Sequence, residues 1–196
     1  MTTFVSSAFT GRIDALTFDN SGNLYAANAD YSLVHKIDAS GNDSVFSGSY
    51  LGFQDAYALQ AAFRNPHGMC MSQDGTTIYV ADTNNHLIRA MNIVSGDTRT
   101  IAGGGGYSQG FTASGYSDGA GLNARFSYPY DILADTSGNL FVADSANNRI
   151  RQIQLSTGVV TTVAQLSYGP ICLRFSANNT ILFTGNNCIT ELVPNT

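Results

Sequence analysis

Short apolar runs separated by turn residues recur along the whole chain. Residues 129–163 show the pattern most completely, with four short strands, a Ser-Gly turn and an Asn-rich turn. Runs of four to six residues that are rich in β-branched and aromatic side chains, and bounded by Gly, Asn and Ser, are typical of β-strands. Four strands to a unit, repeated along the chain, predict an all-β protein built as a β-propeller.

Four copies of this unit divide the chain. They are expected at about residues 14–47, 66–102, 129–164 and 170–193, within a single domain that covers residues 1–196. The first strand of each copy carries apolar residues two positions apart, so we expect one face of each sheet to pack against the next blade. Aligning the copies on an aromatic residue of the second strand makes four positions equivalent: Tyr25, Tyr79, Phe141 and Phe183.

The two ends of the chain bear on whether the propeller closes. The fourth copy ends before a fourth strand, while residues 2–6 resemble the fourth strands of the second and third copies. An N-terminal strand that completes the C-terminal blade would close the ring and remove two exposed sheet edges. We therefore predict four blades with this closure. The alternative is an open arc completed by another subunit, which would make the chain a homo-oligomer or a self-assembling structural subunit.

The two middle copies resemble the NHL repeat family. The resemblance rests on YVADTNNHLIR at residues 79–89, on FVADSANNRIR at residues 141–151, and on the lead-in segments at residues 61–68 and 118–129. The outer copies match more weakly, because Asn28 and Asn186 stand where the middle copies have aspartate. The resemblance covers nearly the whole chain and implies a β-propeller, and propellers of this family usually have six blades.

An aspartate and an arginine recur together in the middle copies. Asp82 and Asp144 end a strand just before an Asn-rich turn, and Arg89 and Arg151 follow one strand later. Each carboxylate is expected to accept turn N–H groups or to pair with the arginine of the adjacent strand. A catalytic residue is rarely needed in every blade, so these four are predicted to be structural.

The charge balance limits which kinds of partner the chain is expected to bind. Charged residues make up 12% of the chain, and the formal net charge is −5. A nucleic-acid partner is attracted mainly by basic residues, so this balance argues against one. No apolar stretch approaches the roughly 20 residues of a membrane span. The N-terminus lacks the basic and apolar regions of a signal peptide, which leaves the location unknown and slightly favours the cytoplasm.

Candidate catalytic residues are few. The three histidines lie in different strand or loop contexts without metal-ligand spacing, so no cofactor and no metal are predicted. Of the three, His67 is expected to face the central channel. The three cysteines are expected to be thiols buried in strands, with a bridge between Cys172 and Cys188 as the alternative.

The tyrosines gather in particular connections. Eight of the ten fall in links between blades or in turns between the second and third strands of a blade. Both kinds of connection emerge on the same face of a propeller. Loops on a rigid scaffold carry function, and tyrosine gives contact area at low entropic cost. A binding face is therefore predicted, with Tyr128 and Tyr130 nearest the channel mouth; the alternative is that several tyrosines fill gaps between blades. The predicted binding residues are Tyr31, His67, Tyr107, Tyr116, Tyr128, Tyr130, Asp131 and Tyr168.

Two function classes follow. The first is a non-catalytic binding or scaffold module whose loop face binds a protein, a peptide or a glycan. The second is an enzyme resembling the metal-dependent lyase or lactonase-like propellers, in which His67, Asp14 and Asp131 would converge at one channel mouth. The aromatic loops and the scarcity of concentrated ionisable groups favour the binding module.

Overall fold

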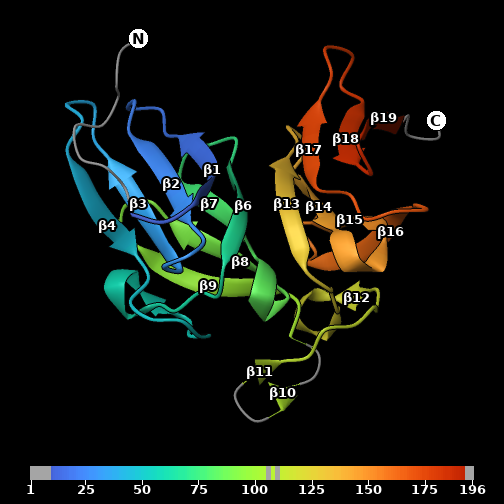
Figure 1. The fold of residues 1–196 in the computed structure, drawn as a ribbon, viewed down its shortest axis with the longest axis horizontal. Helices are drawn as coiled ribbons and strands as arrows, with labels where there is room; N and C mark the ends of the chain where they lie inside the picture. Colours follow the sequence, from blue (N-terminus) through green and yellow to red (C-terminus); the bar gives the residue numbers. More distant parts are fainter. Residues whose placement is uncertain (1–9, 105–106, 109–110, 193–196) are drawn as a thin grey trace.

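The computed structural model describes residues 10–104, 107–108 and 111–192, which form an all-β protein (Figure 1). All but one short pair of the described strands group into four antiparallel sheets that lie side by side around a common centre. Each sheet is one blade, and the blades follow one another in chain order. The predicted four-blade propeller arrangement is therefore confirmed.

The first two blades each contain four strands in sequence order. The first blade consists of β1 (Ile13–Phe18), β2 (Leu24–Asn28), β3 (Leu33–Ile37) and β4 (Asp43–Ser47). The second consists of β6 (Pro66–Met71), β7 (Thr77–Asp82), β8 (Leu87–Asn92) and β9 (Asp97–Ala102). The short β5 (Ala56–Tyr57) pairs with β9 and adds an outer edge to the second blade.

The third blade repeats this plan and the fourth is shorter. The third consists of β13 (Pro129–Ala134), β14 (Asn139–Asp144), β15 (Arg149–Gln154) and β16 (Val159–Gln165), with β12 (Gly119–Ala120) beside β16. The described part of the fourth consists of β17 (Cys172–Phe175), β18 (Ile181–Gly185) and β19 (Cys188–Leu192). A separate pair is formed by β10 (Tyr107–Ser108) and β11 (Phe111–Thr112).

Four single-turn 3-10 helices lie in the described connections. They are η1 (Ala58–Gln60), η2 (Thr83–Asn85), η3 (Gly121–Asn123) and η4 (Ser145–Asn147). Among the helices that the structure describes, none is long and apolar enough to cross a membrane.

Aspartate-led turns join the first and second strands of two blades. The Asp19 Oδ1 atom accepts N–H groups from Ser21 and Asn23, each at 2.9 Å. Gly22 occupies the left-handed region with a φ of 83°, which glycine adopts without steric cost. The same arrangement recurs at Asp135. The sequence Asp-x-Ser-Gly-Asn therefore sets these turns by its own side chains.

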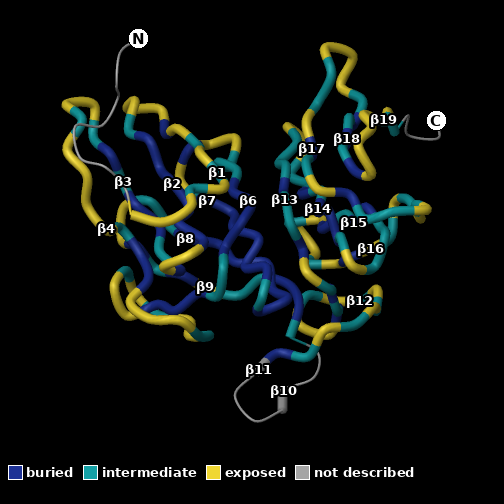
Figure 2. The backbone as a smooth tube through the Cα atoms, viewed as in Figure 1, coloured by how far each residue is buried: buried dark blue, intermediate teal, exposed yellow. Residues whose placement is uncertain are grey.

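Three hydrophobic clusters fill the three interfaces between consecutive blades (Figure 2). Tyr25 and Phe63 are fully buried between the first and second blades. Phe126 is fully buried between the second and third blades. Truncating such a buried aromatic ring to alanine costs about 3–5 kcal/mol, so these clusters hold the blades together.

The apolar face of each inner strand packs against the preceding blade, not the next one as predicted. Met69 of β6 packs among first-blade residues, Ile132 of β13 among second-blade residues, and Leu173 of β17 among third-blade residues. Leu16 is the equivalent residue of β1, and it is 58% exposed. The twist of the blades decides which neighbour a face meets, and side-chain alternation alone does not reveal it.

The predicted alignment of Phe183 with the other aromatic residues is wrong by one position. Tyr79 and Phe141 point toward the blade that follows, whereas Phe183 points back toward the third blade. The register of β18 makes Phe183 equivalent to Val142, because Leu173 pairs with Phe183 as Ile132 pairs with Val142. A shift of one residue moves a strand's side chains to the opposite face. Aligning the copies on an aromatic residue therefore placed Phe183 on the wrong face of its strand.

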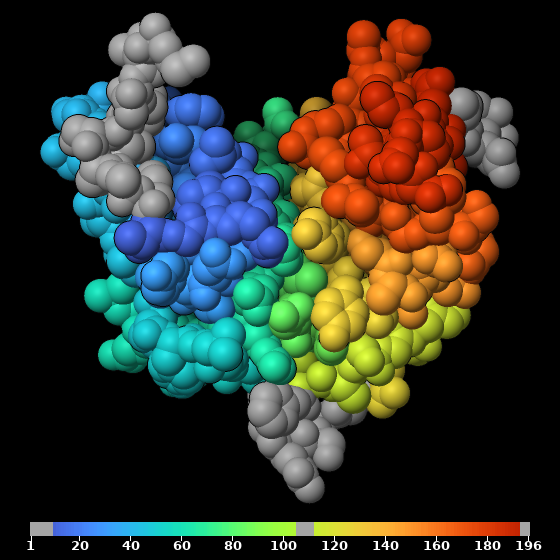
Figure 3. All heavy atoms as spheres, in the orientation of Figure 1, coloured from blue at the N-terminus to red at the C-terminus, as the bar shows by residue number. Residues whose placement is uncertain are grey.

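The predicted closing strand, residues 2–6, lies outside the described residues. Within the described residues the fourth blade has three strands. The inner strands β6 and β13 lie against each other, as do β1 and β6, and β13 and β17. A cleft separates the first blade from the fourth on the face shown in Figure 3. The site described below opens into this cleft.

Two matching ion-pair networks lie inside the second and third blades. Arg89 donates to Asp82 at 2.8 Å and to Asp55 at 2.7 Å, and the guanidinium and the Asp82 carboxylate are completely buried. Arg151 makes the equivalent bonds to Asp144 at 2.8 Å and to Asp118 at 2.6 Å.

Each arginine in these networks also donates to two backbone carbonyls of the connection that precedes its blade. Burial raises the pKa of Asp82, against the opposing effect of Arg89. These networks tie each lead-in to its blade.

All three cysteines are free thiols, so the alternative of a bridge between Cys172 and Cys188 is wrong. Burial raises the pKa of the Cys70 thiol. Cys188 is exposed, contrary to the expectation that it would be buried in a strand. Its sulfur donates to the Gly185 carbonyl oxygen at 3.0 Å, across the tight turn between β18 and β19.

Candidate functional site

The inner strands of the first three blades each contain a bulge near their start. The register shifts between Ile13 and Ala15 in β1, between Pro66 and Met69 in β6, and between Pro129 and Ile132 in β13. An extra residue in one strand re-aims side chains out of the regular alternation. The residues within the three bulges are Asp14; His67 and Gly68; and Tyr130 and Asp131.

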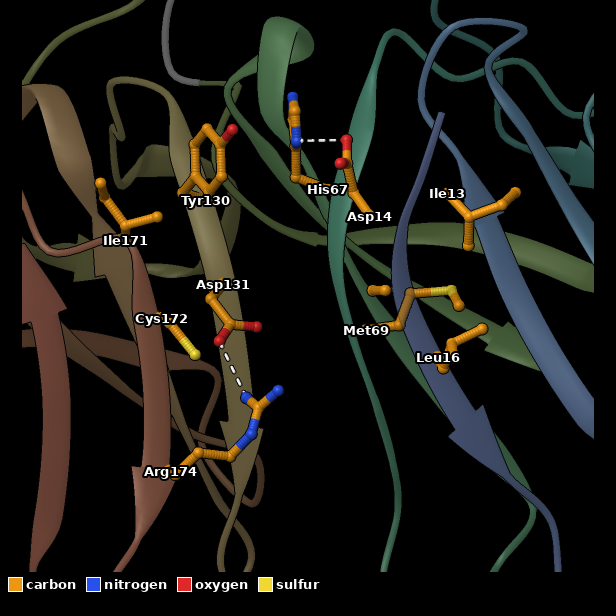
Figure 4. A pocket seen from close by; sticks show the side chains of 11 residues that line it. Ile13, Asp14, Leu16, His67, Met69, Tyr130, Asp131, Ile171, Cys172 and Arg174 are labelled. Atoms are coloured by element: carbon orange, nitrogen blue, oxygen red, sulfur yellow. Dashed lines mark hydrogen bonds and ion pairs between the residues drawn. The ribbon is translucent and has the colours of Figure 1, made fainter. Parts of the chain in front are cut away.

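These side chains line one pocket of about 530 Å³, to which the inner strands of all four blades contribute (Figure 4). Ile13, Leu16, Met69 and Ile171 provide apolar walls. The polar lining consists of Asp14, His67, Tyr130, Asp131, Cys172 and Arg174. Residues that are far apart in sequence thus meet at the centre of the propeller.

His67 is held between a carboxylate and an aromatic ring. Its Nδ1 atom lies 2.7 Å from the Asp14 Oδ2 atom, which also accepts a hydrogen bond from Arg12 Nε at 2.9 Å. The Tyr130 ring stacks on the imidazole with centroids 4.2 Å apart and planes 25° apart. Burial lowers the pKa of His67, although the Asp14 charge opposes this effect. This shift favours the neutral form of the imidazole.

Asp131 accepts hydrogen bonds from donors of two blades. Its Oδ2 atom accepts the Leu173 N–H at 2.8 Å and Arg174 Nη1 at 3.1 Å, and its Oδ1 atom accepts the Ile132 N–H at 2.9 Å. Burial raises the pKa of Asp131, and these donors oppose the rise. A Cβ at Gly68 would lie 2.6 Å from the Asp131 Cα, so glycine is required for the close approach of β6 to β13.

The other predicted binding residues lie away from this pocket. Tyr128 has a φ of 52°, its N–H donates to His86 Nδ1 at 3.1 Å, and its ring contacts the His86 ring. The Tyr116 ring lies under the Arg149 guanidinium, 3.8 Å from centroid to Cζ. The Tyr168 hydroxyl is 2.6 Å from Thr190 Oγ1. Tyr31 is 54% exposed in the turn after β2, and the side chain of Tyr107 lies outside the described structure.

The structure thus brings three of the predicted binding residues, His67, Tyr130 and Asp131, into one place. Arg174 belongs to the same site but was missed, because its proximity to Asp131 depends on how the third and fourth blades pack. Asp55 and Asp118 of the buried networks were also missed as partners of the arginines. Aligning the two lead-in segments would have revealed them, since each precedes its arginine by a similar interval, 34 and 33 residues.

The pocket does not fit a metal centre. Among the described residues, no group of three or more His, Cys, Asp or Glu side chains is arranged to hold a metal ion. His67, Asp14 and Asp131 do share the pocket. However, Arg12 and His67 engage Asp14, and backbone N–H groups with Arg174 engage Asp131. Both carboxylates are already engaged by donors of the protein itself.

Comparison with known proteins supports the repeat assignment. The NHL repeat model matches residues 63–91, which run from the second lead-in into β8. NHL repeat-containing protein 2 from Bos taurus is 31% identical over 121 residues, which are 60% of this chain. The chain spans only 17% of the length of that relative.

Solved propeller structures share the fold. A structural genomics protein of unknown function from Bacteroides thetaiotaomicron superimposes with a TM-score of 0.68 and 16% identity, covering 88% of this chain and 44% of that one. Virginiamycin B lyase from Staphylococcus aureus gives a TM-score of 0.63 and 17% identity, covering 93% of this chain and 55% of that one. These comparisons identify an NHL repeat at residues 63–91 and show that the chain has a β-propeller fold.

Proposed function

We propose that the chain is a non-catalytic binding module that takes a protein or peptide ligand at its loop face, with part of the ligand entering the central pocket. The observation that carries this proposal is the convergence of four inner strands on one pocket whose carboxylates are already paired. Its volume of about 530 Å³ suits part of a ligand, since small-molecule pockets span roughly 300–1,000 Å³.

The arrangement around His67 supports binding over catalysis. A histidine that activates a nucleophile needs a hydroxyl or thiol within hydrogen-bond reach. Within the described residues, none is hydrogen-bonded to His67, whose one close polar neighbour is Asp14. A buried imidazole stacked on Tyr130 gives a rigid, partly apolar surface, and such aromatic surfaces are frequent anchors in protein interfaces.

Replacing Tyr130 tests the proposed binding function. A phage-displayed peptide library and a glycan array are screened on the wild-type protein, on Tyr130→Ala, and on Tyr57→Ala as a control. Tyr57 is 64% exposed and lies outside the pocket. Peptides enriched on the wild type should bind Tyr130→Ala about tenfold more weakly, as expected for loss of an aromatic anchor.

The control variant should bind the same peptides with wild-type affinity. Equal binding to all three proteins would contradict the proposal, because the ligand would then lie away from the pocket. Selective enrichment of glycans without peptides would also contradict it.

A further inference from the structure

The pocket contains hydrogen-bonding groups that the protein itself does not use. The Nη1 atom of Arg174 donates to Asp131 and to the Leu173 carbonyl oxygen. Within the described part of the chain, its Nη2 and Nε atoms have no hydrogen-bond partner, and its side chain is 66% exposed. Figure 4 shows the guanidinium reaching from β17 toward the cleft between the blades. A guanidinium with unused N–H donors therefore lies at the edge of the pocket.

The planar geometry of a guanidinium favours a particular chemical group as its partner. Its planar fork of N–H donors matches the two oxygens of a carboxylate and favours paired, charge-assisted hydrogen bonds. Asp131 accepts two backbone N–H groups as well as Nη1, and the Nη2 and Nε donors of Arg174 make no hydrogen bond to it. The unused side of Arg174 is thus suited to an external carboxylate.

The opposite wall presents an acceptor. With the proton of neutral His67 on Nδ1, facing Asp14, the Nε2 atom carries a lone pair. Figure 4 shows this second nitrogen pointing away from Asp14. A peptide N–H is a suitable donor to it. The Tyr130 hydroxyl, which also has no partner among the described residues, can donate or accept.

The remaining lining is aliphatic and accessible. Leu16 is 58% exposed and Ile171 is 49% exposed, and both contribute to the pocket from opposite sides of the cleft. Covering such side chains with another aliphatic group is favourable by about 25 cal/mol for each Å² removed from water. The walls therefore favour an apolar side chain beside the carboxylate.

We propose that the pocket binds a carboxylate of a peptide ligand on Arg174, with an adjacent backbone N–H on His67 and an aliphatic side chain between Leu16 and Ile171. This inference rests on the proposed binding function and specifies its ligand. The carboxylate is either the C-terminus of the peptide or an Asp or Glu side chain. Both sources present the same group to the guanidinium, and the test separates them.

The test is a synthetic peptide array made with free C-terminal carboxylates and again with C-terminal amides, each set with and without Asp and Glu. It is probed with the wild-type protein, Arg174→Gln, Arg174→Lys and Tyr130→Ala, and with Arg99→Gln as a control. Arg99 is an exposed arginine of β9 outside the pocket. The strongest peptide is then titrated by calorimetry against each protein.

The peptides that bind the wild type should carry a carboxylate. Arg174→Gln should weaken them by about tenfold or more, and Arg174→Lys by less, because lysine keeps the charge without the fork. Loss of binding in the amide set identifies the C-terminus as the source, and dependence on Asp or Glu identifies the side chain. Either result supports the inference, provided that Arg99→Gln binds as the wild type does.

Peptides that bind Tyr130→Ala weakly but bind Arg174→Gln as tightly as the wild type would overturn this inference and leave the binding function intact. An array on which no peptide is retained by the wild type would overturn both. Should Arg174→Gln fail to fold, Arg174→Lys decides, since it preserves the ion pair with Asp131.

Discussion

Two kinds of aspartate–arginine pair lie in this propeller, one inside the blades and one at its centre. Arg151 is completely buried, and both of its terminal nitrogens are saturated by carboxylates and backbone carbonyls. Arg174 is 66% exposed and donates through a single terminal nitrogen to Asp131 and to the Leu173 carbonyl oxygen. The same chemistry thus serves structure where both terminal nitrogens of the arginine are used, and is available for binding where one terminal nitrogen remains.

The largest expected effect comes from removing the buried arginine. Arg151→Met leaves the Asp144 carboxylate buried without its cation, which should reduce the free energy of unfolding by about 3–5 kcal/mol. Arg174→Met breaks an exposed pair and should cost less than about 1 kcal/mol. Urea denaturation of the two variants checks this contrast, and equal losses would contradict it.

A smaller loss is expected where two blades approach closely. Gly68→Ala places a methyl group 2.6 Å from the Asp131 Cα. The resulting overpacking should cost about 1–3 kcal/mol. Gly138→Ala serves as a control for the added methyl group, because a Cβ there meets nothing within 4 Å, although its φ of 82° adds some backbone strain. Thermal unfolding should show Gly68→Ala as the less stable variant; the reverse order would argue against close contact of β6 with β13.

A comparable effect is expected from the outer carboxylate of the buried network. Asp118→Ala removes an acceptor of Arg151 and of the Thr162 N–H, while the Asp144 pair remains. The cost should be about 1–2 kcal/mol, below that of Arg151→Met, because the guanidinium keeps its buried partner. Chemical denaturation provides the measurement, and a loss as large as that of Arg151→Met would show that Asp118 is the main counter-charge.

The smallest effect is a pH dependence. The folded pKa of His67 lies below its ordinary value, so acidification protonates the unfolded state first. Stability contributed by neutral His67 is therefore present above the ordinary pKa of about 6.5 and is lost as the pH falls toward the folded value. His67→Asn should lose less stability than the wild type between pH 7 and about pH 5.5. Parallel unfolding curves for both proteins across this range would contradict the assignment.

Local features of the fold were predictable from sequence. Asp82 and Arg89 are seven residues apart on adjacent strands joined by a short turn, so their pairing follows from one hairpin. The turn sequence at Asp19 likewise carries its own hydrogen-bonding partners. In these cases the interacting residues are close in the chain, and strand geometry alone brings them together.

Long-range features were harder to predict. His67 was expected at the channel, but its contact with Asp14 spans two blades. Arg174 lies in the fourth blade, and its position beside Asp131 depends on how that blade packs against the third. The error at Phe183 has the same origin, since its face is decided by strand register and not by residue type. Such contacts need the relative placement of blades, which repeat spacing does not supply.

The most direct test of whether Arg174 holds the ligand is calorimetric titration of the selected carboxylate peptide into Arg174→Gln. We expect a dissociation constant at least about tenfold above that of the wild type and of Arg99→Gln, because the peptide loses its charge-assisted hydrogen bonds. An unchanged dissociation constant would show that the exposed arginine at the centre of the propeller does not hold the ligand.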